Sequence, residues 1–426
     1  MKNEDKEEVL YLRGLMASHL DENTSLQTAE ETFSTLIANY PQGQYADSAL
    51  YGLGTLAFRA GNYEKAEHYF VTLAQNYSQS SFAGEAWYWA AEAAEKRGSS
   101  FDHFRKKAYV HYPQSPHADE AYFKMFDFRD YVEGKSEALE HLNLLATHFP
   151  ESPLKVAAFY LLALHESSFV HAQKYLQLAL LFFDQKLKEG LNPSVSLVYF
   201  RYRTQMELAE LYLNNPDSNE RRSLSISLLK SLINDFENPH HPLTAKLKTH
   251  CQYPPLHEEG EFLLAQAYLK TDQIYLAQEM FSKMLAHYST AGIKEGYFLA
   301  KVWQEQGTLA SQCSDFETAL HCFRMSEECG RSHFSTDELL SLWILESDCY
   351  RGKGNLDQAM RMLSQVINQD VVSPLRIKAM LLRSEIYELQ GRGELAIRQL
   401  ESTAKKGGSW GLQAKERLKE RYGIES

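Results

Sequence analysis

The chain repeats one short motif at nearly constant spacing. Four copies begin at Tyr40, Tyr77, Tyr112 and Phe149, so their starts are 37, 35 and 37 residues apart, and they read YPQGQYADSALY, YSQSSFAGEAWY, YPQSPHADEAYF and FPESPLKVAAFY. Each copy places an aromatic residue, usually followed by proline, and a small residue before an alanine-rich stretch. Proline stops the preceding helix, and the turn after it lets the next helix begin. The motif therefore predicts pairs of helices joined by short turns.

A second pattern extends the repeat through most of the chain. A small residue is followed by large apolar residues four, seven and eleven positions later, as in Ala66, Phe70, Leu73 and Tyr77. This spacing places all four side chains on one face of a helix. Further copies start at Ala29, Ala138, Ala172, Ser225 and Ala277, and weaker ones at Ala319, Ala359 and Ala396. The small residue lets two helices approach closely, because a bulky side chain there would clash.

The partner helix of each pair is also visible. Twelve residues before several of these small residues stands another one, as at Gly307 and Ser347, each preceded by a tryptophan four residues earlier. Together these residues resemble the W-x2-LG-x2-Y…A-x3-F…P signature of the tetratricopeptide repeat family over residues 8–404. The resemblance implies an all-α fold, a right-handed superhelical solenoid of about ten helical hairpins. The segment SWGLQAKERLKERYG after Gly408 predicts an amphipathic helix that caps the array.

Uneven repeat spacing predicts three blocks. Residues 1–188 form a regular N-terminal block, residues 189–255 an irregular middle repeat with a long insertion loop, and residues 256–426 a C-terminal block with the capping helix. The insertion begins at Glu237 and is rich in proline, which favours a loop.

The YPxSxxA turn resembles a subclass of bacterial cell-envelope proteins. These are the outer-membrane assembly lipoprotein of the BamD type and the periplasmic protein that works with the Tol–Pal system, and the resemblance covers residues 29–165 best. It implies a non-catalytic scaffold that binds other proteins of an envelope assembly or division complex, located in the envelope or periplasm if a leader has been removed. The opening MKNEDKEEVLYL lacks the charge pattern of a secretory signal. A cytoplasmic peptide-binding adaptor or chaperone-like subunit is therefore the alternative.

An aromatic stripe is the candidate partner-binding groove. Position five of four successive first helices is aromatic, and the stripe with its neighbours comprises Tyr51, Phe58, Tyr88, Trp89, Phe123 and Tyr160. First helices line the concave face of such arrays, and aromatic side chains make good anchors for a peptide. The same positions could instead pack between helices, and the sequence leaves both interpretations open.

Composition and motifs favour proteins or peptides as partners over other ligands. The 44 Lys and Arg against 56 Asp and Glu give a net charge of −12, which repels nucleic-acid phosphates. The apolar runs are too short to cross a bilayer. No GxSxG, HExxH or paired-carboxylate motif occurs, so the chain is predicted not to be an enzyme and to need no cofactor.

Histidine and cysteine residues give only a weak indication of metal binding. Five cysteines without a CxxC pair predict buried free thiols rather than disulfides or a zinc ribbon. The insertion gathers His240, His241, His250, Cys251 and His257. Their spacing matches no compact metal motif. We therefore predict no metal site and an exposed interaction loop, with zinc binding as the alternative.

Overall fold

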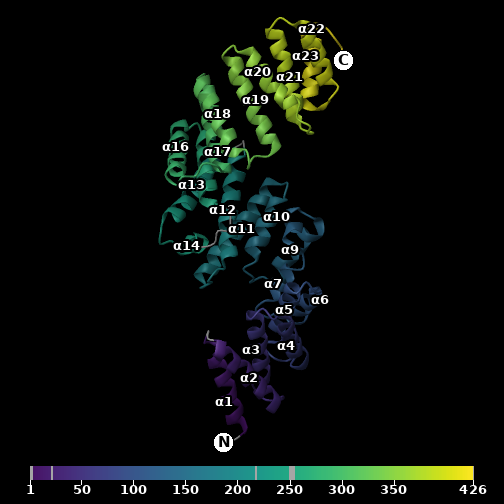
Figure 1. Cartoon of the computed structure of the whole chain (residues 1–426), viewed down its shortest axis with the longest axis vertical. Coiled ribbons are helices and arrows are strands. Elements are labelled where there is room, and N and C mark those ends of the chain that lie inside the picture. The colour runs from purple at the N-terminus through teal and green to yellow at the C-terminus, as the bar shows by residue number, and fades with distance from the viewer. Residues whose placement is uncertain (1–2, 21–22, 216–217, 249–254, 426) are drawn as a thin grey trace. The chain divides into compact units, whose positions relative to one another are not determined.

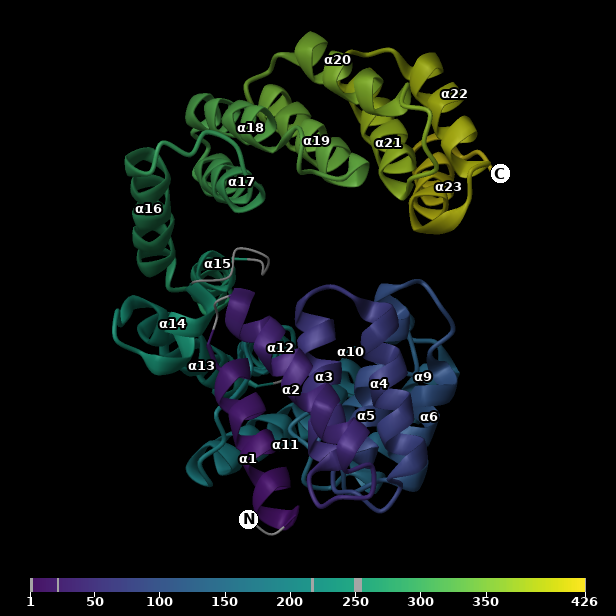
Figure 2. The ribbon, with the colours of Figure 1, turned by 60° about the horizontal axis from the view of Figure 1, so that its bottom comes forward.

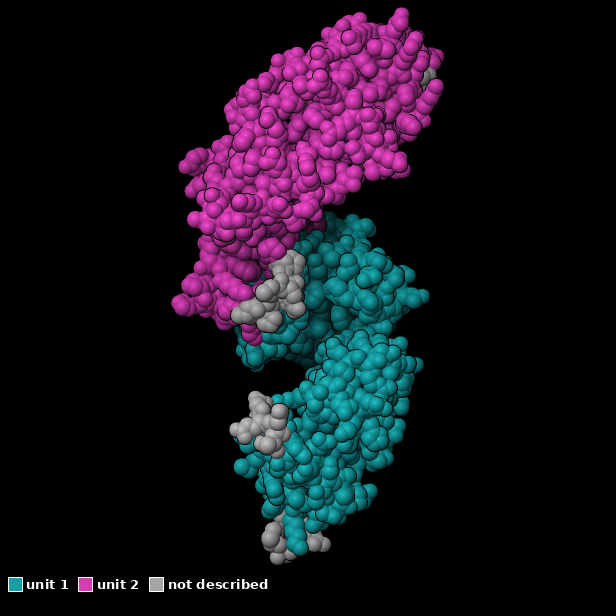
Figure 3. Space-filling model, in the orientation of Figure 1, with its two compact units in different colours: residues 1–208 teal, residues 209–426 magenta. Residues whose placement is uncertain are grey.

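The protein is built from α-helices. The computed structural model describes residues 3–20, 23–215, 218–248 and 255–425, and these contain 23 helices and no β-strand (Figure 1). The chain divides into two compact units, residues 1–208 and 209–426 (Figure 3). The boundary lies within α12 (Val195–Leu213), inside the predicted middle block. The division into three blocks stays a prediction.

The first unit contains a run of short paired helices and the first part of α12. Its helices are α1 (Asn3–Ser18), α2 (Asn23–Asn39), α3 (Ala46–Arg59), α4 (Tyr63–Asn76), α5 (Ala83–Lys96), α6 (Asp102–His111), α7 (Ala118–Phe123), α8 (Phe128–Val132), α9 (Ser136–His148), α10 (Lys155–Leu164) and α11 (Phe169–Lys188).

The second unit continues the pattern, and from α15 to α23 its consecutive helices lie next to one another (Figure 2). They are α13 (Asn219–Glu237), α14 (Pro242–Lys248), α15 (Leu256–Lys270), α16 (Ile274–Thr290), α17 (Tyr297–Gln312), α18 (Phe316–Gly330), α19 (Thr336–Gly352), α20 (Leu356–Ile367), α21 (Pro374–Leu389), α22 (Gly393–Ala404) and α23 (Gly408–Tyr422).

Consecutive helices pack as hairpins, which confirms the predicted all-α array. The packed pairs in the first unit are α1–α2, α3–α4, α5–α6 and α10–α11, and α9 packs on both α7 and α8. In the second unit they are α15–α16, α17–α18, α19–α20 and α21–α22. These nine hairpins in the described part of the chain agree with the predicted number of about ten.

The close helix contacts fall at the predicted small residues. Ala66, Phe70 and Leu73 of α4 are fully or almost fully buried. A Cβ atom added to Gly54 of α3 would lie 2.6 Å from the Phe70 ring. Any side chain at Gly54 would therefore push these two helices apart, as the repeat pattern predicts.

At two junctions the serine of the YPxSxxA turn joins a repeat to the one before it. Ser80 donates a hydrogen bond of 2.6 Å from Oγ to Oδ2 of Asp47, and Ser152 donates one of 2.5 Å to Oδ2 of Asp119. Each serine Oγ also accepts from the backbone N–H two residues later. The hydroxyl therefore fixes its own turn and binds the carboxylate of the previous repeat at the same time.

The junction between these two, at Ser115, lacks this contact. The carboxylate position is occupied by Gly84, and the Oγ atom of Ser115 is buried without a hydrogen-bond partner among the described residues. A Cβ atom at Gly84 would lie 2.5 Å from Cβ of Tyr112 and 2.6 Å from Cβ of Ser115. The junction is too tight for the aspartate that stands at this position in two other repeats, as Asp47 and Asp119.

The last helix covers the end of the array, as predicted. Ala414 and Leu418 of α23 are fully buried, and the helix packs on α21 and α22. The guanidinium of Arg417 lies 2.6 Å from a carboxylate oxygen of Glu385 and 2.6 Å from one of Glu388. The positive charge of Arg417 in α23 is therefore paired with carboxylates inside the second unit.

The insertion is more regular than predicted. Residues 242–248 form α14, whose Leu243 and Leu247 side chains are buried and anchor it. His250 and Cys251 lie outside the described residues.

The described cysteines are all free, and Cys322, Cys329 and Cys349 are buried as predicted. The prediction is wrong for Cys313, which is exposed because it caps the C-terminal end of α17.

Candidate functional site

Two members of the predicted aromatic stripe are built into the core of the first unit. The side chain of Tyr88 is 3 % exposed and that of Tyr160 is 7 % exposed. The Tyr88 ring stacks on His117 of the next turn, with ring centroids 4.6 Å apart. These two tyrosines offer a partner almost no surface, so for them the structure favours the packing alternative.

The other members of the stripe keep part of their surface. Tyr51 stacks on Phe82 at 4.9 Å, and Phe58 meets the edge of Trp89 at 5.2 Å. All of these side chains are partly exposed, and so is Phe123. Tyr51, Phe58, Trp89 and Phe123 therefore remain candidate contact residues.

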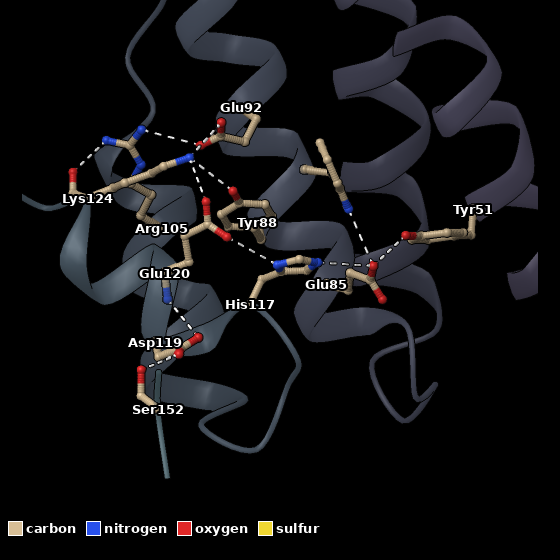
Figure 4. A network of polar contacts seen from close by, with 11 residues as sticks. Tyr51, Glu85, Tyr88, Glu92, Arg105, His117, Asp119, Glu120, Lys124 and Ser152 are labelled. Atoms are coloured by element: carbon tan, nitrogen blue, oxygen red, sulfur yellow. Dashed lines mark hydrogen bonds and ion pairs between the residues drawn. The ribbon is translucent and has the colours of Figure 1, made fainter. Parts of the chain in front are cut away.

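A network of charged and polar groups links three successive repeats (Figure 4). Tyr51 donates a hydrogen bond of 2.5 Å to Oε1 of Glu85. His117 lies between two carboxylates, with Nε2 3.6 Å from Glu85 and Nδ1 3.4 Å from Glu120. Lys124 continues the chain of contacts, 3.1 Å from Glu120. These three repeats are thus held together by hydrogen bonds and ion pairs as well as by apolar packing.

The two carboxylates fix the charge of His117. Hydrogen bonds with Glu120 and Glu85 raise the pKa of His117 to about 9, although burial opposes this. Burial alone would raise the pKa of Glu120, but the hydrogen bond with His117 and the charge of Lys124 lower it to about 2. At neutral pH the imidazole is therefore a cation that donates from both ring nitrogens.

The first helix of the fourth repeat is broken. Helices α3 and α5 each have 14 residues, whereas α7 has six and is followed by a connection, residues 124–127, before α8. Asp127 caps α8 by accepting a hydrogen bond of 2.8 Å from the backbone N–H of Arg129. The chain thus ends one helix and starts another where the neighbouring repeats continue without interruption.

Buried side chains satisfy the carbonyl groups that the break exposes. Arg105, whose side chain is 4 % exposed, donates a hydrogen bond of 2.7 Å to the carbonyl oxygen of Lys124. Tyr131 is fully buried and donates one of 2.7 Å to the carbonyl oxygen of Phe123. Unpaired buried carbonyl groups are costly, so these two donors hold the break open as a stable feature.

A cavity of about 710 Å³ lies beside the break. It is bounded by the end of α5, the start of α6, the end of α7, the 124–127 connection, α8 and the first turns of α10 and α12. The lining residues are Glu95, Phe101, Asp102, Arg105, Glu120, Phe123, Lys124, Met125, Phe126, Asp127, Phe128, Pro153, Leu154, Ala157, Ser194, Ser196, Leu197 and Phe200. Its volume is in the range of about 300 to 1,000 Å³ that is usual for ligand sites. Five of its lining residues are phenylalanines.

Comparison with protein-family models identifies the repeat. The model described as tetratricopeptide repeat matches residues 15–81 and 51–116. Residues 15–116 therefore match tetratricopeptide repeats. No curated protein matches the chain in sequence.

Two solved structures that contain tetratricopeptide repeats are similar to this chain. The repeat-containing signal-transduction ATPase with numerous domains from Pyrococcus horikoshii is 12 % identical, with a TM-score of 0.53, and the match covers 98 % of this chain and 63 % of that one. A tetratricopeptide repeat protein from Parabacteroides merdae is 18 % identical, with a TM-score of 0.40, covering 70 % of this chain and 95 % of that one. The likeness to the Pyrococcus horikoshii protein, at 12 % identity, concerns the fold alone. The proposed relation to the BamD and Tol–Pal subclass has no support from these comparisons.

Sequence reasoning found only one member of the cavity, Phe123. It treated the first helix of the fourth repeat as continuous, so it did not bring the 124–127 connection or Phe128 to the site. The available signal was Asp127, a good N-cap residue within an otherwise apolar stretch. Phe200 was also missed, because nothing local connects α12 to the fourth repeat.

The second unit holds a small group of possible metal ligands. One ligand atom each of Glu237, His257 and Glu261 lies within 4.8 Å of the others. Lys283 places its Nζ atom 2.6 Å from Glu237 and 2.9 Å from Glu261. Because the two carboxylates already share a cation, the geometry is that of an ion-pair cluster between repeats.

No helix in the described ranges combines the length and the apolar character needed to cross a membrane.

Proposed function

We propose that the chain is a non-catalytic scaffold for protein–protein interaction, and that its first unit binds a partner segment in the cavity beside the broken helix. Tetratricopeptide repeats generally mediate contacts between proteins. The observation that carries the proposal is the cavity itself, about 710 Å³ in volume and lined by five phenylalanines.

The break makes the cavity a preformed site. Arg105 and Tyr131 hold the ends of the broken helix through hydrogen bonds of 2.7 Å each. A partner therefore does not have to order this backbone on binding, which lowers the entropic cost of association. Aromatic rings add large contact area with few rotatable bonds, so they suit recognition of a peptide segment.

A cavity-filling substitution tests the proposal. Ser196 is exposed and lines the cavity, so Ser196→Trp places a bulky ring in its mouth with little risk to folding. Ser136 is an exposed serine in the first turn of α9 that does not line the cavity, and Ser136→Trp is the matched control. A phage library of random 12-residue peptides would be selected for binding to the wild-type chain. Peptides that bind wild type and Ser136→Trp but not Ser196→Trp are the expected result, and equal binding to all three would contradict the proposal.

The cellular setting that we propose is a bacterial cell-envelope assembly or division complex. The supporting observation is the YPxSxxA turn and its resemblance to envelope proteins. The second candidate is a cytoplasmic peptide-binding adaptor or chaperone-like subunit, favoured by the buried free thiols of Cys322, Cys329 and Cys349. Fractionation of the source cells with an antibody against the chain separates the two settings. Recovery from the cytosol alone would remove the envelope setting.

A further inference from the structure

We infer that the cavity selects a partner segment that carries a large apolar side chain next to lysine or arginine. The inference rests on the proposed function and specifies the chemistry of the partner. It follows from two properties of the wall, its aromatic surface and its unbalanced charge.

The aromatic part of the wall accepts a large apolar side chain. Rings from three separate parts of the unit face the same space: Phe101 before α6, Phe126 and Phe128 around the break, and Phe200 on α12. Phe128 is 48 % exposed, so the surface is open to a partner. Burial of an aromatic or long aliphatic side chain there removes apolar surface on both molecules from water.

The cations that line the cavity are already neutralised. Lys124 lies 3.0 Å from Glu92 and 3.1 Å from Glu120. Arg105 lies 2.7 Å from Glu95 and 3.5 Å from Glu92. Neither cation is available to an acidic partner without breaking contacts that hold the repeats together.

Two carboxylates on the wall have no such partner. Asp102 begins α6 and Asp127 caps α8, and both are exposed. Within the described part of the chain, no cation lies at ion-pair distance from either. The lining residues comprise four carboxylates, those of Glu95, Asp102, Glu120 and Asp127, and two cations, those of Arg105 and Lys124. The difference of two negative charges attracts a positively charged segment and repels an acidic one.

The wall already contains one contact between a cation and an aromatic ring. The guanidinium carbon of Arg105 lies 4.3 Å from the centroid of the Phe101 ring. Aromatic faces attract cations through their quadrupole, and this attraction adds to that of the two free carboxylates. A lysine or arginine beside the inserted apolar residue therefore meets both kinds of surface.

Two labelled probe peptides test the inference by fluorescence anisotropy. They are nine residues long and identical, except that a central phenylalanine is flanked by two lysines in one and by two glutamates in the other. The lysine peptide is expected to bind the wild-type chain more tightly at low salt. Asp102→Asn with Asp127→Asn is expected to weaken its binding about fivefold, because two partly exposed ion pairs are lost. Asparagine still caps a helix, so the second substitution preserves α8.

The controls separate failure of the inference from failure of the proposed function. Asp184→Asn removes an exposed carboxylate of α11 that does not line the cavity, and it should leave both affinities unchanged. The inference is overturned if the wild-type chain binds both peptides equally, or if the double asparagine variant still prefers the lysine peptide. The cavity keeps its proposed role in either case, provided that Ser196→Trp abolishes binding. If Ser196→Trp leaves binding of the lysine peptide unchanged, both are overturned.

Discussion

At the scale of single residues, His117 shows how one substitution adapts a repeat. It occupies the turn position that Phe82 holds in the preceding repeat, and its ring stacks on Tyr88 as the Phe82 ring stacks on Tyr51. Unlike phenylalanine, it also contacts the carboxylates of Glu85 and Glu120. The same packing position therefore gains an electrostatic role.

We expect His117 to make the stability of the first unit depend on pH. Its pKa is raised from 6.5 to about 9, so its contribution is fully present below pH 6.5 and is lost as the pH rises through 9. A shift of this size corresponds to about 3 kcal/mol at most, and partial exposure reduces this to about 1–2 kcal/mol. His117→Phe keeps the stacked ring and should remove the loss. The check is the midpoint of urea unfolding, measured by circular dichroism at pH 6.5 and at pH 9.5 for the wild-type chain and the variant. Equal falls in the midpoint of the two proteins would show that His117 is not responsible.

At the scale of the elements, the turns were predictable and the broken helix was not. Proline, small residues and the apolar stripe act locally, so the sequence predicted the paired helices and their close contacts. The break after Phe123 depends on Arg105 and Tyr131, which come from other helices. The segment AYFKMFDF contains neither proline nor glycine, so a continuous helix was the natural expectation. The cavity was missed because it follows from this tertiary effect.

The junction turns allow a matched comparison of two serines. Ser152→Ala should lower the free energy of unfolding by about 1–2 kcal/mol, because it removes the hydrogen bond to Asp119 and leaves the backbone N–H of Leu154 without its acceptor. Ser115→Ala should change it by less than about 0.5 kcal/mol, because that hydroxyl has no partner among the described residues. Thermal unfolding of both variants measures the difference. Similar losses of stability would contradict the role assigned to the Asp–Ser contact.

At the scale of the whole molecule, stability should be a sum of local contributions. In repeat arrays each hairpin contacts only its neighbours, so damage at one end need not reach the other. Helix α23 packs on its two neighbours in the second unit, α21 and α22.

We expect Leu418→Ala to destabilise only the end of the second unit. Leu418 is fully buried in α23, and the cavity left by its truncation should cost about 2–4 kcal/mol. Hydrogen-exchange mass spectrometry should then show faster exchange in α21 to α23 and unchanged exchange in α1 to α11. Leu412→Ala, at a position in the same helix that is 62 % exposed, is the control and should change neither region. Faster exchange in the first unit would mean that the repeats fold as one cooperative body.

The tight junction at Gly84 limits how the chain can be rearranged in evolution or by design. A repeat transplanted from another copy of the motif would bring a side chain to this position, the aspartate of Asp47 or Asp119 or the valine of Val156. Its Cβ atom would collide with Tyr112 and Ser115. Duplication or shuffling of single repeats across this point therefore requires a compensating change in the following turn. The modules look interchangeable in sequence, but this junction fixes which neighbours can follow each other.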